Sequence, residues 1–351
     1  MRRLKLLLLI LLIPAVLPAQ QDTLAYDHLP FAMYDTDTGF GAGYKGVLRN
    51  ALGARESFDL TLFLSTKGER WVRIGWSMPD AELRQGSAYP FAVDVVADYD
   101  KMITNSFFGV GPDAHFDDRE IYTYEPLELT AAFSRGFSSK LIGTMQLRFK
   151  RVWSYAFDRL GALETHPDNS TSADLWSATL QLRHDTRNSV LHPSRGSVLQ
   201  AEVERAFPVT AIAKTWTREA LWAQYYTEWK SVIIALRTGV QSMQGDDIPI
   251  QHMLPIGGNR TVRGIPKDRF LDRNSIVCNA ELRFPIYRRL GGVAGVDAGT
   301  VAPEVGKLFT SRWIVTPVIG LRLIFDTFVT RADLGYSEDA VGFYLNFGQV
   351  F

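Results

Sequence analysis

An alternation of apolar and polar residues with a period of two runs along most of this chain. In residues 58–64, 91–99 and 199–204, Leu, Val, Phe or Ala occupies about every second position, and Asp, Glu, Gln or Thr occupies many of the others. This period places successive side chains on opposite faces of a β-strand. Convincing amphipathic helical patterns are absent after the first 20 residues. The chain is therefore predicted to be an all-β protein.

The polar positions of these strands distinguish between two all-β architectures. A soluble β-sandwich also alternates, because one face of each sheet is core and the other is wet. Here the polar positions carry acids and bases together, as at Glu128, Arg148, Lys150 and Glu202, which fits the wet interior of a membrane barrel. Hairpins of two ~10-residue strands, each with a turn and a loop, divide about 330 residues into about sixteen strands. We therefore predict a transmembrane antiparallel β-barrel of about sixteen strands.

The N-terminal residues predict export. Arg2, Arg3 and Lys5 precede the apolar run 6–13, and breakers and small residues follow up to Ala19, as in a cleaved secretory signal peptide. No Cys follows directly, which excludes a lipoprotein, and the single Cys278 excludes an intrachain disulfide. The predicted division is a signal peptide at 1–19, a short periplasmic segment at 20–37, and a barrel at 38–351 whose first strand is 39–48. The predicted location is the outer membrane of a Gram-negative bacterium.

Charge and motif content narrow the classes of function. Lys and Arg total 38, and so do Asp and Glu, so a basic surface for nucleic acid is not indicated. The sequence has no His-Glu-x-x-His pair, no Gly-x-Ser-x-Gly elbow and no phosphate-binding Gly-rich loop. We predict neither an enzyme nor a metal or cofactor site.

The last alternating segment is residues 342–351, which end on an aromatic residue. This segment resembles the signal by which bacterial outer-membrane barrels are recognised for insertion. Phe347, Gly348 and Phe351 are the candidate residues of that signal, and the outer-membrane assembly machinery is the expected partner for insertion of the chain.

Residues 257–265 read Gly-Gly-Asn-Arg-Thr-Val-Arg-Gly-Ile. With Gly257, Gly258, Val262, Gly264 and Ile265 as its motif, this segment resembles the sixth extracellular loop of the outer-membrane protein 85 superfamily, the BamA/TamA-like or bacterial surface antigen barrels. Ile265 departs from the Phe or Tyr of that family. Further similar segments are the Phe-Gly-x-Gly turn at 108–111, the Asp-x-Arg and Pro-x-x-Gly elements at 185–196, and strands at 280–285 and 296–299.

The resemblance implies that this loop folds into the barrel and that acids on the wall hold Arg263. A buried guanidinium needs carboxylate partners, because an unpaired buried charge is expensive. Strand parity points Glu281 inward, together with Asn279 and Arg283, and it points Asp297 inward between Val296 and Ala298. We expect Arg263, Glu281 and Asp297 to form a positional lock without a catalytic role.

The family also implies functions, which the sequence leaves open between three hypotheses. Typical members carry periplasmic POTRA domains, for which residues 20–37 are too few, so we expect a barrel without them. The first hypothesis is outer-membrane protein or lipid assembly and translocation, through a weak seam between the first and last strands, with Gly39, Gly41, Gly43 and Gly46 weakening the first strand. The second is a narrow channel for small solutes. The third is an accessory barrel that docks a periplasmic partner through residues 20–37. Expected partners are outer-membrane lipids and periplasmic or client proteins.

Overall fold

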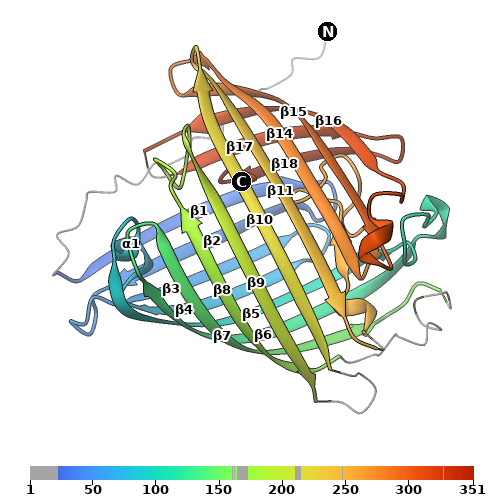
Figure 1. Ribbon diagram of the computed structural model, residues 1–351, viewed down its shortest axis with the longest axis horizontal. Helices are drawn as coiled ribbons and strands as arrows, with labels where there is room; N and C mark the ends of the chain where they lie inside the picture. The colour runs from blue at the N-terminus through green and yellow to red at the C-terminus, as the bar shows by residue number, and fades with distance from the viewer. Residues whose placement is uncertain are drawn as a thin grey trace, which may run out of the picture.

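The computed structural model describes residues 23–351, apart from residues 160, 162, 164–172, 210–214, 247 and 327. The predicted signal peptide therefore lies outside the described residues. Sixteen strands of the described chain close into one antiparallel barrel (Figure 1), which confirms the predicted fold and strand number. The barrel strands are β1 (Ala25–Asp35), β2 (Gly39–Arg49), β3 (Ser57–Ser65), β4 (Arg70–Met78), β5 (Tyr89–Phe107), β6 (Glu120–Gly136), β7 (Leu141–Tyr155), β8 (Leu175–Asp185), β9 (Gly196–Pro208), β10 (Trp216–Trp229), β11 (Val232–Gln244), β14 (Asn274–Tyr287), β15 (Leu290–Ala302), β16 (Ile314–Ile324), β17 (Val329–Tyr336) and β18 (Val341–Phe347).

Four short helical elements of the described chain lie outside the barrel wall. They are the helix α1 (Ala81–Arg84) and the 3-10 turns Phe116–Asp118, Ile250–His252 and Val305–Lys307. Strands β12 (Leu254–Ile256) and β13 (Phe270–Asp272) pair with each other inside the connection between β11 and β14. Among the described residues, no helix is long and apolar enough to cross a membrane.

The outer face of the wall is apolar, and this follows from the alternation in the sequence. On β3, Leu60, Leu62 and Leu64 are exposed, whereas Thr61 and Phe63 between them are buried against the interior. A soluble sandwich would bury such a leucine row, but a membrane barrel presents it to lipid. The β-sandwich alternative is therefore wrong.

The two ends of the barrel differ in their connections. One end, which we call the turn end, carries the short turns 137–140, 230–231 and 288–289 together with the longer connections 50–56, 79–88 and 186–195. At the loop end, residues 245–273 link β11 to β14 and turn back into the barrel (Figure 1). Apolar side chains of this segment, the inserted loop, pack on the inner wall in two clusters, one with Trp216 and Met243 and the other with Val277 and Val301. The inserted loop therefore fills much of the interior at this end.

The predicted start of the barrel was wrong. Residues 25–35, which we assigned to a periplasmic segment, form β1, and the predicted first strand 39–48 is β2. The alternation was hidden because the inward face of β1 carries an aromatic ring where polar residues were expected. The Phe31 ring stacks with that of Phe63, with 6.1 Å between ring centroids, and the two rings occupy space in which a Cβ on Gly43 or Gly41 would clash. These glycines therefore make room for phenylalanine rings, and they do not belong to a terminal strand.

The last strand also ends earlier than expected. β18 stops at Phe347, Gly348 has a φ of +77°, and the following residues turn into the interior. Phe351 is 7% exposed and packs on Tyr226, while Arg283 donates a 3.1 Å hydrogen bond to its backbone oxygen. Only glycine adopts this φ without strain, so Gly348 allows the change of direction. The role of Phe347, Gly348 and Phe351 in insertion concerns the unfolded chain and stays a prediction.

Candidate functional site

The inserted loop reaches the wall at a point where two glycine backbones touch. Gly264 has a φ of +98°, and a Cβ built on it would lie 2.7 Å from backbone atoms of Gly335 and Tyr336 on β17. A Cβ on Gly335 would in turn lie 2.6 Å from the backbone of Arg263. The approach is therefore open only to glycine at both positions. It brings the backbone of residue 263 directly against the inner wall.

Arg263 lies at this contact and is completely buried among three carboxylates. Its Nε lies 2.7 Å from Asp297 Oδ2, its Nη2 donates to Asp297 Oδ1 at 2.9 Å, and its backbone N–H donates to Oδ2 at 3.0 Å. Its Nη1 lies 2.8 Å from Glu281 Oε1 and 3.0 Å from Asp333 Oδ2. The structure thus brings together the three residues singled out in the sequence and adds Asp333. We call these four residues the loop lock.

Further arginines surround the same acids. Arg283 Nε lies 2.8 Å from Glu281, and Arg331 Nη1 lies 2.7 Å from Asp333, whereas Asp297 has Arg263 as its cation among the described residues. Arg322 contacts both Glu281 and Asp333. Sequence reasoning missed Asp333 and its arginines, although the parity of residues 329–336 places Arg331 and Asp333 on the inward face. The alternation that identified Glu281 and Asp297 as inward-facing is therefore also present in residues 329–336.

Burial and neighbouring charges shift the pKa of the Arg263 guanidinium in opposite directions. Burial alone would lower the pKa of its guanidinium, but the carboxylates, Asp297 above all, raise it well above its usual value. Charge-assisted, two-pronged hydrogen bonds also fix the orientation of a guanidinium. Val262 and Ile265 beside it are 0% and 2% exposed and pack with Val277 and Val301. Ile265 therefore fills the buried apolar position at which the family has an aromatic residue.

The wall closes through a short seam between the first and last strands. β1 pairs with β18 at Tyr34↔Leu345 and Asp35↔Tyr344, whereas it pairs with β2 along its entire length. Beyond these pairs, Thr36 donates its N–H to Phe343 O at 3.1 Å, and its hydroxyl accepts from Phe343 N at 2.8 Å. All of these contacts lie at the loop end. The seam is therefore closed at one end and lacks strand pairing along the rest of β1.

The inserted loop holds both sides of the closed end of the seam. On the β1 side, Asn259 donates to Asp35, and the N–H of Lys267 donates to Asp37 at 3.1 Å. On the β18 side, the Tyr344 hydroxyl accepts from Gly264 N at 3.1 Å. The loop lock and the seam are therefore parts of one connected arrangement.

The ion pairs of the loop lock hold the inserted loop in position on the inner wall. Within the described residues, no group of three His, Cys, Asp or Glu side chains is placed to hold a metal ion. Cys278 is half-buried, and its Sγ lies 3.4 Å from the Thr238 hydroxyl.

Comparison with known proteins identifies the family. Solved structures with a similar fold include BamA from Haemophilus ducreyi lacking POTRA domains 1-3, with a TM-score of 0.67, 12% identity and coverage of 94% of this chain and 70% of that chain. CdiB from Escherichia coli gives a TM-score of 0.66 at 13% identity over 94% of this chain and 63% of its own. CdiB from Acinetobacter baumannii gives 0.60 at 14% identity over 93% and 60%.

The chain thus spans less than two thirds of either CdiB, and identities this low show the fold alone. None of the curated proteins compared with the chain matches it. The model of the Omp85 superfamily domain matches residues 50–351, which include the inserted loop, the lock and β18. The chain is therefore a member of the Omp85 superfamily and an outer-membrane barrel.

Proposed function

We propose that this barrel assists the assembly of outer-membrane polypeptides by pairing an incoming β-strand with the free part of β1. The observation that carries the proposal is the seam, in which β1 is paired with β18 only at Tyr34 and Asp35. The backbone of β1 before these residues forms a sheet edge within the membrane wall. An edge of this kind is a template for another strand.

The backbone direction of β1 supports this role. Thr36 directs its N–H across the seam, so the alternate residues Tyr34, Ala32, Pro30 and His28 direct their backbone groups the same way. Each backbone group left without a partner in hydrocarbon costs several kcal/mol. A client strand would satisfy these groups, and the relief of this cost would favour its pairing with β1. Pro30 has no N–H to donate, so pairing would run on either side of it.

The chemistry of the edge favours a polypeptide over a lipid as the client. A row of alternating N–H and C=O groups is complementary to another extended backbone, and lipid acyl chains offer no such partners. The accessory hypothesis used residues 20–37 as a docking segment, but Ala25–Asp35 are part of the wall. The assembly hypothesis therefore has the stronger structural support.

A disulfide across the seam tests the proposal. Tyr34 and Leu345 are directly opposed, and opposed residues of antiparallel strands have Cα separations that a disulfide can bridge. The double variant Tyr34→Cys with Leu345→Cys, made with Cys278→Ala, would be placed in phosphatidylethanolamine and phosphatidylglycerol vesicles. A urea-denatured eight-stranded outer-membrane barrel would serve as client, and its folding would be followed by heat-modifiable migration on gels. Oxidation should slow client folding, because it keeps β18 joined to β1 and prevents the seam from opening to make room for a strand beside the free part of β1, and reduction should restore it.

The matched control is a disulfide elsewhere on β1. Ala32 and Ala42 are opposed on β1 and β2, so linking them leaves the seam free. Oxidation of that pair should leave client folding unchanged. Equal client folding by the oxidised and reduced seam variant would refute the proposal.

A further inference from the structure

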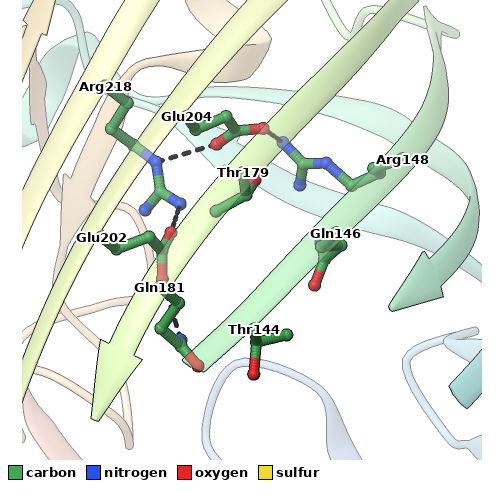
Figure 2. Close-up of a pocket in the computed structure, with 8 residues that line it drawn as sticks. All are labelled: Thr144, Gln146, Arg148, Thr179, Gln181, Glu202, Glu204 and Arg218. Atoms are coloured by element: carbon green, nitrogen blue, oxygen red, sulfur yellow. Dashed lines mark hydrogen bonds and ion pairs between the residues drawn. The ribbon is translucent and has the colours of Figure 1, made fainter. Parts of the chain in front are cut away.

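Cations on the inner wall of β7 to β10 are paired with carboxylates. Arg148 binds Glu204, and Arg218 Nε lies 3.0 Å from Glu204 Oε2, as the dashed lines in Figure 2 mark. Arg218 also binds Glu202, whose Oε2 accepts a 3.3 Å hydrogen bond from Gln181 (Figure 2). The charges of this inner row are therefore neutralised within the protein.

The turn end of the same strands carries cations without such neutralisation. Four of its connections, 137–140, 186–195, 230–231 and 288–289, contain six Lys or Arg residues and no Asp or Glu. They join β6 to β7, β8 to β9, β10 to β11 and β14 to β15, which are eight neighbouring strands of the closed wall. The cations therefore follow one another around half of the barrel, on the side away from the seam.

The turn-end connections nearer to the seam have a different charge. Residues 50–56, 79–88 and 325–328 together contain four acids and two cations. The excess of positive charge is therefore a property of the side opposite the seam.

Five of the six cations are exposed, and the sixth, Arg187, is buried against Asp185. Among the described residues, Lys140, Lys230 and Arg288 form no ion pair with a carboxylate. The other two each have one surface acid within 4 Å, yet more than half of each arginine side chain remains exposed. We call these five exposed residues the cationic rim: Lys140, Arg195, Lys230, Arg288 and Arg289.

Exposed aromatic rings accompany the cationic rim. Trp229 is 65% exposed, Tyr287 64% and Phe137 57%. Lys230 Nζ lies 4.9 Å from the centre of the Trp229 ring, and Arg288 Cζ lies 5.1 Å from the centre of the Tyr287 ring. Aromatic rings and long cationic side chains occur together at the level where lipid acyl chains meet the headgroups.

The position of the rim in the membrane follows from the wall. On β10, Trp229 has the same parity as Leu221 and Tyr225, which are exposed on the lipid-facing side. Lys230 follows Trp229 directly, so its ammonium lies just beyond the apolar wall. Short turns lie on the periplasmic side of outer-membrane barrels, which places the rim among the headgroups of the periplasmic leaflet. Rings on the lipid-facing wall favour a lipid surface over a soluble acidic protein as the partner of these cations.

We propose that the cationic rim binds anionic phospholipid headgroups and so holds the side of the barrel opposite the seam in the membrane. The net negative charge of phosphatidylglycerol complements an unpaired Lys or Arg, whereas phosphatidylcholine has no net charge. Each cation near an anionic surface strengthens binding about fivefold. The contact does not involve the seam, so it is a function in addition to the pairing of client strands.

Native mass spectrometry of the folded barrel in detergent tests the proposal, with phosphatidylglycerol and phosphatidylcholine of identical acyl chains as probes. The unmodified barrel should bind its first phosphatidylglycerol at least about fivefold more tightly than its first phosphatidylcholine. Lys140→Gln with Lys230→Gln and Arg288→Gln removes the three cations that have no carboxylate partner. This triple variant should lower the preference for phosphatidylglycerol at least about threefold.

Two controls separate the rim from general effects of charge. Arg70→Gln with Lys307→Gln and Arg312→Gln removes three exposed cations of the loop end and should leave the lipid preference unchanged. A second triple variant exchanges Lys for Arg and Arg for Lys at the three rim positions, and it should also keep the preference. Heat-modifiable migration would first show that every variant is folded.

Two outcomes would overturn the proposal. Equal binding of the two lipids by the unmodified barrel would leave the rim to an acidic protein partner. An equal loss of preference in the loop-end variant would show that the effect follows net charge alone. Client folding is measured separately and bears on neither outcome.

Discussion

Removal of the guanidinium at Arg263 tests how strongly the inserted loop is held. In Arg263→Ala, Glu281 keeps Arg283 at 2.8 Å and Asp333 keeps Arg331 at 2.7 Å. Asp297 instead loses two side-chain hydrogen bonds and keeps the N–H of residue 263. The variant therefore leaves one completely buried carboxylate without its cation.

The expected loss in the free energy of unfolding follows from the buried Asp297 carboxylate that is left without a cation. Breaking a buried ion pair by removing one partner costs about 3–5 kcal/mol, mostly through the charge left behind. The double variant Arg263→Ala with Asp297→Ala removes the stranded charge as well. It should therefore be destabilised by clearly less than the sum of the two single variants.

The assay is equilibrium unfolding in detergent micelles, followed by tryptophan fluorescence and by heat-modifiable migration. The control is Arg195→Ala, because Arg195 is 73% exposed and lies 3.2 Å from Glu228. A surface pair of this kind contributes about 0–1 kcal/mol. If Arg263→Ala and Arg195→Ala lower the free energy of unfolding equally, the loop lock is not a stabilising unit and the reasoning fails.

Three further predictions concern the loop and its contacts. Glu281→Gln should also lower the free energy of unfolding by about 3–5 kcal/mol in the same assay, since two buried arginines lose a counter-charge; no change would contradict it. Gly264→Ala should cost about 1–3 kcal/mol because of its φ of +98° and its 2.7 Å backbone approach, whereas Gly306→Ala, which meets open space, should cost far less. Burial raises the pKa of the Asp37 carboxyl from 3.8 to about 6, so its contribution to stability is present below pH 3.8 and is lost as the pH rises through about 6. Asp37→Asn should therefore flatten the pH dependence of unfolding in that window, and an unchanged slope would contradict this assignment.

The fold could be predicted because a barrel wall imposes a strict period of two on its strands. That period, with charges on the inward face, was enough for the architecture and for the inward direction of Glu281 and Asp297. It failed at β1, where Phe31 points inward over Gly43 and the expected polar face is apolar. The period of two also failed to predict the end of β18. Gly348 has a left-handed backbone conformation that ends the strand, although the alternation of apolar and polar residues does not change there.

The site could be predicted only in part, for a different reason. Arg263, Glu281 and Asp297 were found by parity and by the likeness of the loop motif to a known family. The meeting of Gly264 with Gly335 depends on how far the loop enters the barrel, which local sequence does not determine. The extent of pairing between β1 and β18 is likewise a property of closure between distant segments. Both features needed the three-dimensional structure.

The most direct test of the proposed function is photo-crosslinking in living cells from the free part of β1. A photoreactive residue at position 32, whose backbone faces the seam, would be compared with one at Ala201, which is exposed on the outer face of β9 far from the seam. We predict that position 32 captures unfolded outer-membrane polypeptides and that position 201 does not. Capture of the same products at both positions, or of none at position 32, would contradict the account.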